Sequence, residues 1–199
     1  MWQGLVVEAK SLACERGGRL IFKELNFTVH GGEVVELRGP NGAGKSTLLR
    51  LMAGLNRAAE GSLRCNGAAL VNDHVHYIGH NEAIKPALTV RQNLSFWQSF
   101  LGGPNIEALK PFRLEQLADD EARLLSEGQK RRLALSRLVA VARPIWLLDE
   151  PTVGLDQAAL VDLRRELQSH LQLGGMVIAA THADIGIKGS RPLELAPTP

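Results

Sequence analysis

One eight-residue stretch constrains the fold of this chain more than any other. The stretch GPNGAGKS, Gly39 to Ser46, matches the pattern G-x-x-x-x-G-K-[ST]. It directly follows the apolar, strand-like segment EVVEL and directly precedes the helix-patterned segment KSTLLRLMAGL. A phosphate-binding loop requires this strand–loop–helix context, so the sequence predicts an α/β fold of the P-loop NTPase type.

The residue types of the loop each have a role toward phosphate. Its glycines let consecutive backbone N–H groups converge on phosphate oxygens. Lys45 is expected to reach the β- and γ-phosphates, the Ser46 hydroxyl to ligate Mg²⁺, and Thr47 to contact the α-phosphate. The predicted nucleotide-binding residues here are Gly39, Pro40, Asn41, Gly42, Ala43, Gly44, Lys45, Ser46 and Thr47.

Polar residues follow two further apolar strands. The segment IWLLDE ends in Asp149 and Glu150, and a P-loop site needs a carboxylate at the end of a neighbouring strand. We expect Asp149 to hold Mg²⁺ and Glu150 to act on the attacking water as a general base. The segment MVIAATH places His182 at the same sheet edge, within reach of the γ-phosphate. Without the phosphate loop, these residues would instead indicate solvated strand ends and a structural histidine.

The hydrophobic pattern divides the chain into three parts. The first third is rich in strand patterns, with glycine pairs at the turns. Leucine-spaced helical stretches replace them from Glu82 to about Ala140. Continuous apolar runs typical of a buried parallel sheet then return on either side of the helix-patterned LDQAALVDLRRELQSHLQL. We expect residues 1–199 to form a single domain with a helical insert at about 81–140.

Composition excludes several classes of protein. The formal net charge is +2, and the 23 basic and 21 acidic residues are scattered, so we expect no nucleic-acid partner. Cys14 and Cys65 lack CxxC spacing, which argues against zinc or redox sites and favours two reduced thiols. We expect a soluble chain, because it lacks a signal-peptide pattern and any window of about 18 apolar residues. It could still bind a membrane protein.

Positive charge gathers where one helix is predicted to begin. The stretch LLSEGQKRRLALSR places Lys130, Arg131 and Arg132 near a helix N-terminus, which already carries a partial positive charge. Either Glu127 offsets these cations or an anion binds there. For each cation, a solvated position beside Glu127 and a role in anion binding remain open.

These segments together resemble the ATP-binding-cassette (ABC) ATPases. The phosphate loop, LSEGQ, LLDEP and the TH after the next strand follow the order of that family and cover nearly the whole chain. The resemblance implies a mostly parallel core sheet, an N-terminal antiparallel β subdomain and an inserted helical subdomain. It also implies ATP and Mg²⁺ as cofactors and hydrolysis of ATP to ADP and phosphate.

The resemblance further implies that two copies of the chain share each nucleotide. In the family, the LSEGQ-like signature faces the γ-phosphate of a nucleotide bound by the second subunit. The corresponding signature residues here are Ser126, Glu127, Gly128 and Gln129, and Asp156 in VGLD corresponds to the loop that links the two sites. We therefore expect an ATP-dependent homodimer.

Two positions depart from the usual pattern of the family. Most members stack an aromatic residue on adenine, whereas the corresponding residue here is Arg16, whose planar guanidinium can also stack. Most members also have a glutamine between the core and the helical insert, whereas this chain has His80 followed by Asn81, and either can replace it. With His80, Glu150 and His182 as catalytic residues, turnover should slow on acidification.

Two segments favour a narrower resemblance. LACERGGRLIF and YIGHNEAIKPALTVRQNL resemble the ATP-binding subunits of cytochrome c maturation systems, often described as haem exporters. This implies a peripheral protein on the cytoplasmic face of the bacterial inner membrane, bound to integral membrane subunits. The family places a groove for the membrane subunit in the helical insert. There, the helical spacing of Leu94, Phe96, Trp97 and Phe100 favours core positions over a docking surface.

Two other functions remain open. A soluble or other-substrate ABC ATPase would couple hydrolysis to conformational change, for example on ribosomes or DNA, but such proteins usually fuse two domains or carry long insertions. A P-loop kinase would share Lys45 and Asp149 but has no use for LSEGQ. Release of free phosphate with no phosphorylated acceptor distinguishes an ATPase from a kinase.

Overall fold

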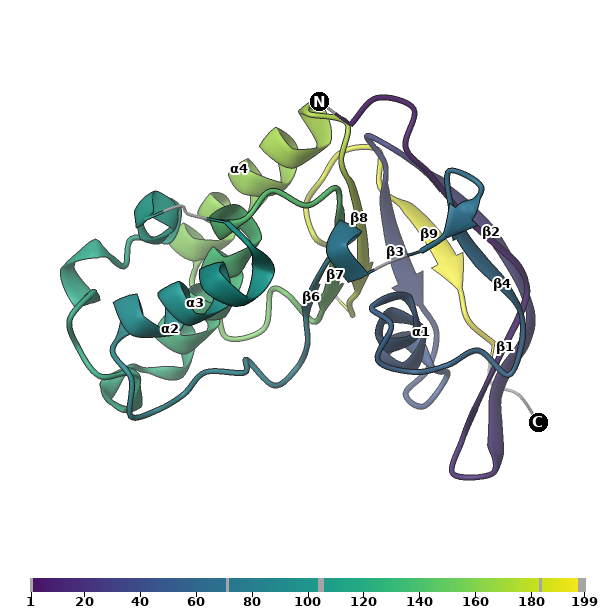
Figure 1. Ribbon diagram of the computed structural model, residues 1–199, viewed down its shortest axis with the longest axis horizontal. Coiled ribbons are helices and arrows are strands. Elements are labelled where there is room, and N and C mark those ends of the chain that lie inside the picture. The colour runs from purple at the N-terminus through teal and green to yellow at the C-terminus, as the bar shows by residue number, and fades with distance from the viewer. Residues whose placement is uncertain (1, 71, 104–105, 183, 197–199) are drawn as a thin grey trace.

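Two sheets and a group of helices build the molecule. The computed structural model describes residues 2–70, 72–103, 106–182 and 184–196. Figure 1 shows the parallel strands in the middle, with α2, α3 and α4 on one side and α1 and the second sheet on the other. None of the helices in these described ranges is both long enough and apolar enough to cross a bilayer.

The central sheet has the strand order β6-β7-β8-β3-β9, and every neighbouring pair is parallel. The register pairs Asp149 with Ala180, so β7 and β8 end at the same level. The last strand was not expected from the sequence, because it is short, lies at the sheet edge and contains Pro192. The strands are β3 (Val34–Arg38), β6 (Val75–Ile78), β7 (Ile145–Asp149), β8 (Met176–Ala180) and β9 (Arg191–Glu194).

The second sheet is antiparallel and has the order β2-β1-β4-β5. A hairpin joins its two long strands at Gly17 and Gly18, whose φ angles of 58° and 72° require the left-handed region. The predicted turn and the N-terminal antiparallel region are thus confirmed. The strands are β1 (Val6–Arg16), β2 (Arg19–His30), β4 (Glu60–Cys65) and β5 (Ala68–Ala69).

The segment between the two halves of the parallel sheet is helical, as predicted. Within its described residues, strand pairing is limited to an isolated bridge between Thr89 and Glu121. Much of the segment forms short 3-10 turns instead of long helices, because glycine and proline interrupt it. The α-helices are α1 (Lys45–Met52), α2 (Val90–Leu101), α3 (Glu127–Ala140) and α4 (Gln157–Gln172). The 3-10 helices are η1 (Asn72–His74), η2 (Ile106–Phe112), η3 (Glu115–Leu117) and η4 (Ala122–Leu124).

The parallel sheet serves two hydrophobic cores, one on each face. On β7, Ile145 and Leu147 pack toward α1 and the antiparallel sheet, whereas Trp146 and Leu148 pack toward α2, α3 and α4. Alternation along the strands explains why these runs are apolar throughout. Burial of each of these aliphatic side chains stabilises the fold by about 1.5–3 kcal/mol.

The aromatic residues of α2 correct one prediction. Leu94 is in the core, but Phe96 and Phe100 are 39% and 71% exposed and Trp97 is half-buried. The buried face of this helix is formed by Val90, Leu94 and the polar side chains near them, and the phenylalanines occupy another face. Their spacing is helical, but spacing alone does not identify the face that is covered.

Candidate functional site

The phosphate loop connects β3 to α1, and its own backbone carbonyls bind the side chain of its lysine. The Lys45 ammonium donates to the carbonyl oxygens of Gly39 and Pro40 at 2.7 and 3.1 Å. Gly44 precedes the helix with a φ of 98°, and a Cβ there would lie 2.6 Å from Cγ2 of Ile21. Only glycine tolerates both this φ angle and this close approach. The loop sequence therefore places the Lys45 cation in the first turn of α1, where the free N–H groups of a helix start favour phosphate.

Two oxygen ligands that are far apart in sequence meet beside this lysine. The Ser46 hydroxyl donates to Oδ1 of Asp149 at 3.1 Å across a separation of 103 residues. Asp149 is only 5% exposed at the end of β7. A hydroxyl and a carboxylate are oxygen donors of the kind that Mg²⁺ prefers, so this pair fits the cation predicted for it.

Glu150 has an unusual backbone conformation. Its φ is 48°, in the left-handed region, which costs a residue with a side chain on the order of 1–3 kcal/mol. Its N–H donates to the carbonyl of Ala180 on the next strand at 2.8 Å. Its Oε1 lies 3.6 Å from Nε2 of His182. The carboxylate and the imidazole that the sequence placed at the sheet edge are thus neighbours.

These groups line one cavity of about 720 Å³. Arg16 and His80 also border it, so the two departures from the family pattern lie at the same site as the phosphate loop. Gly39, Pro40 and Ala43 belong to the same loop but do not line the cavity. The predicted site residues that do line it are Arg16, Asn41, Gly42, Gly44, Lys45, Ser46, Thr47, His80, Asp149, Glu150 and His182.

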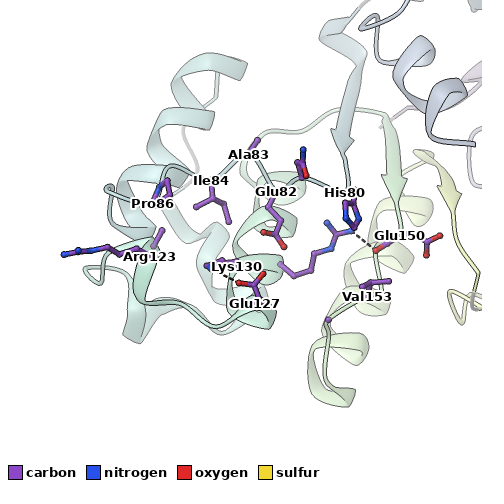
Figure 2. Close-up of a pocket in the computed structure, with 14 residues that line it drawn as sticks. His80, Glu82, Ala83, Ile84, Pro86, Arg123, Glu127, Lys130, Glu150 and Val153 are labelled. Carbon is purple, nitrogen blue, oxygen red and sulfur yellow. Dashed lines mark hydrogen bonds and ion pairs between the residues drawn. The ribbon is translucent and has the colours of Figure 1, made fainter. Parts of the chain in front are cut away.

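A second cavity, of about 600 Å³, adjoins the first. His80 and Glu150 border both cavities, whereas Asn81 lines only the second. Figure 2 shows His80 and Glu150 close together at one end of this space, and the Glu127–Lys130 ion pair farther away. Ser126, Gly128 and Gln129 line neither cavity, so a single copy does not bring the predicted signature residues to its own phosphate loop.

The signature segment forms the first turn of α3. Ser126 is the N-cap: its Oγ accepts the Gln129 N–H at 3.3 Å, and the Gln129 side chain accepts the Ser126 N–H at 2.7 Å. This capping box satisfies two backbone donors of the helix start. The exposed Ser126 hydroxyl keeps its own hydrogen for an acceptor outside the helix.

The three cations after the signature have different partners. Lys130 pairs with Glu127 at 2.7 Å, so that acid offsets one cation as the sequence allowed. Arg132 donates to the carbonyl of Phe112 at 3.3 Å. Arg131 is 4% exposed, which is neither of the two alternatives left open for it. Its guanidinium donates to backbone carbonyls instead of binding an anion or facing solvent.

Burial lowers the pKa of the Arg131 guanidinium, while the nearby carboxylates of Glu82, Asp149 and Glu150 act in the opposite direction. An arginine stays protonated despite such a shift. Sequence reasoning missed this residue as part of the site, because its partners are backbone atoms that no side-chain pattern reveals.

The signature turn lies against the loop that contains Gly154. A Cβ on Gly128 would lie 2.9 Å from the carbonyl oxygen of Gly154. Asp156, expected in the loop between paired sites, caps α4 by accepting the Ala159 N–H at 2.7 Å. The cap anchors the end of this loop, and its role between two copies stays a prediction.

The chain is similar to known proteins in both sequence and structure. Residues 22–153 match the family described as ABC transporter. The chain is 47% identical to the cytochrome c biogenesis ATP-binding export protein CcmA of Paramagnetospirillum magneticum, over 94% of this chain and 92% of that one. It is 46% identical to the protein of the same name from Nitrobacter winogradskyi, over 91% and 94% of the two chains.

Among solved structures, a dimeric ATP-binding cassette in a post-hydrolysis state bound to ADP and Pi has a TM-score of 0.85. It covers 97% of both chains at 24% identity, so this likeness shows the fold alone. The α/β architecture predicted from the sequence is thereby confirmed.

Proposed function

Because this chain belongs to the ABC transporter family of ATP-binding proteins, we propose that it is the ATP-hydrolysing subunit of a membrane complex for cytochrome c biogenesis. The observation that carries the proposal is one cavity lined by the phosphate loop, Asp149, Glu150 and His182. The names of its relatives support the role in cytochrome c biogenesis. We propose haem export or delivery as the process that the complex serves.

In this proposal, residues of the phosphate loop and Asp149 bind the phosphates and the metal. Lys45 would turn from the loop carbonyls to the β- and γ-phosphates, because a nucleotide offers it stronger, charged acceptors. Ser46 and Asp149 would hold Mg²⁺, whose bound charge neutralises the phosphate oxygens. Thr47 follows in the first turn of α1 and would contact the α-phosphate.

Hydrolysis falls to the residues at the strand ends. Glu150 would accept a proton as water attacks the γ-phosphorus and ADP departs. His182, 3.6 Å from that carboxylate, would orient it and contact the γ-phosphate. His80 replaces the usual glutamine in this proposal in preference to Asn81, because His80 borders the cavity of the phosphate loop and Asn81 does not.

The base of ATP would lie at the opposite end of the cavity. Arg16 ends β1 and borders the space together with Ile21 of β2. A planar guanidinium above one face of adenine and an aliphatic side chain beside it hold a ring without reading its edge. We therefore expect weak discrimination between ATP and GTP.

A second copy of the chain would complete each site. Ser126, Gly128 and Gln129 do not line the phosphate-loop cavity of their own copy. They lie at a helix start, where an anion is favoured, and Ser126 is exposed there. ATP bound between two copies would hold them together, and its hydrolysis would release them. ABC ATPases work as such pairs with membrane subunits.

An apolar surface on the helical part supports a membrane partner. Phe100, Phe96 and Leu55 are exposed, and Phe100 and Leu55 border a pocket of about 520 Å³ between α2 and the parallel sheet. Exposed aromatic residues beside a hollow are typical of protein contacts. We place the integral subunits of a cytochrome c maturation complex there, and the chain on the cytoplasmic face of the inner membrane.

Co-purification combined with product analysis tests this function. The tagged chain should retain integral membrane subunits, and the complex should release one phosphate for each ADP formed. A phosphorylated acceptor in place of free phosphate would establish a kinase. Recovery with ribosomes or DNA and without membrane subunits would favour a soluble ABC ATPase.

A further inference from the structure

The Arg131 side chain joins three parts of the chain at one point. Its Nη1 donates to the carbonyl of Gly79 at 3.0 Å, and its Nη2 donates to those of Asp149 and Glu150 at 2.8 and 2.7 Å. Gly79 immediately precedes His80, and Asp149 ends β7. The guanidinium of this residue on α3, the helix that begins with the signature segment, therefore binds both the segment that carries His80 and the segment that carries Glu150.

Burial of the Arg131 cation costs desolvation free energy. Its Nε has no hydrogen-bond partner among the described residues, and the side chain is almost completely enclosed. Its hydrogen bonds to carbonyls involve charge on one side only, and an apolar side chain would fill the same volume without a desolvation cost. The arrangement is instead suited to fixing the direction of the carbonyl groups.

Those carbonyl groups determine where the Glu150 side chain points. The left-handed backbone of Glu150 persists only where its surroundings hold it. On the N–H side it is held by the carbonyl of Ala180. Its own carbonyl accepts from Arg131 at 2.7 Å and, at a longer 3.3 Å, from the Val153 N–H. Without Arg131, only the longer bond from Val153 restrains this carbonyl, so the peptide can rotate to a common conformation and carry the carboxylate away from His182.

We propose that Arg131 is a positioning residue for ATP hydrolysis: by binding the carbonyls of Asp149 and Glu150, it keeps the Glu150 carboxylate directed at the attacking water. This rests on the proposed role of Glu150 as general base. Arg131 lies five residues after Ser126 on the same helix, so a shift of the signature turn would reach Glu150 through this side chain. It touches neither the nucleotide nor the water.

Replacing Arg131 with Gln tests the proposal in the full chain bound to its membrane subunits. The variant should keep the KM for ATP within about threefold while kcat falls about tenfold or more, because ground-state binding does not use the Glu150 backbone. Arg131→Lys keeps the charge but cannot serve three carbonyls, so its kcat should also fall. Arg132→Gln loses a neighbouring cation that binds a different carbonyl and should keep its kcat.

A double variant separates positioning from general stabilisation. If Arg131 acts through Glu150, Glu150→Gln combined with Arg131→Gln should turn over no more slowly than Glu150→Gln alone. A further drop in the double variant, or a kcat for Arg131→Gln within twofold of the unmodified chain, would overturn the proposal. So would equal losses of kcat and of thermal stability in Arg131→Gln and Arg132→Gln.

The two proposals can fail separately. Normal hydrolysis by Arg131→Gln beside a stalled Glu150→Gln would refute the positioning role alone. Normal hydrolysis by Glu150→Gln would refute the role of the base itself, and with it this inference.

Discussion

Glu150 and His182 follow the neighbouring strands β7 and β8, and their side chains lie 3.6 Å apart although 32 positions separate them in the sequence. The register of β7 against β8 produces this contact, since Asp149 pairs with Ala180. A carboxylate held between an imidazole and a backbone fixed on both sides has little freedom to turn. Such restriction is suited to proton transfer at one defined point.

Replacing Glu150 with Gln should preserve ATP binding and slow hydrolysis about 100-fold or more, because the amide cannot accept the proton of water. ATP should then accumulate between two copies, and size-exclusion chromatography should detect a stable dimer. Glu115→Gln, at an exposed position on η3, is the matched control and should hydrolyse normally. Full turnover by Glu150→Gln would exclude it as the base.

Replacing Lys45 with Ala should weaken ATP binding about tenfold or more, because a charged hydrogen bond to phosphate contributes roughly 1.5–3 kcal/mol. Titration of a fluorescent ATP analogue measures the loss. Lys45→Arg keeps the charge, but its larger planar group does not fit the two loop carbonyls, so it should recover only part of the affinity. An unchanged Kd for Lys45→Ala would place the phosphates elsewhere.

Mixing two inactive variants tests whether two copies share each site. Lys45→Ala and Ser126→Ala should each be inactive alone. A mixed pair contains one intact site, formed by Lys45 of one copy and Ser126 of the other, so the mixture should recover roughly a quarter of full activity if pairing is random. Double-variant chains carrying both changes should not complement either single variant. Should Ser126→Ala alone be fully active, the shared site would be wrong.

Acid should destabilise the fold through two buried histidines. Burial lowers the pKa values of His76 and His170 to about 4, from an ordinary value of 6.5. The unfolded chain binds protons more readily than the native one between these values, so stability falls as pH drops from about 6.5 toward 4. Each histidine should reduce the free energy of unfolding by about 2 kcal/mol between pH 7.5 and pH 5.

Urea unfolding of His170→Gln at both pH values checks this. The variant should lose less stability on acidification than the unmodified chain, whereas the exposed His74→Gln should behave like the unmodified chain. Equal pH dependence in all three proteins would contradict the neutral, buried state of His170. His170 stacks on Trp146 with ring centroids 3.9 Å apart, so the variant will be less stable at both pH values and only the difference is informative.

The sequence was most informative where short-range pattern and chemistry coincide. The positions of the phosphate loop, of the carboxylates at the end of β7 and of the histidine after β8 agree with the sequence-based expectation, because parallel strands bring their carboxyl ends to one edge. Their chemical roles stay predictions. The partners of Arg131 were not predictable, since they are carbonyls 18, 19 and 52 residues away. Phe96 and Phe100 were placed wrongly because periodicity reveals a helix but not the neighbour that covers each face.

Gly128 and Gly154 approach so closely that a single methyl group would collide with a carbonyl oxygen. The start of the signature helix therefore leans directly on the loop after β7, with no side chain as a spacer. Alanine at position 128 would therefore push the signature turn and this loop apart. In the proposed pair of copies, the position of the signature turn would thus depend on the absence of a Cβ at Gly128.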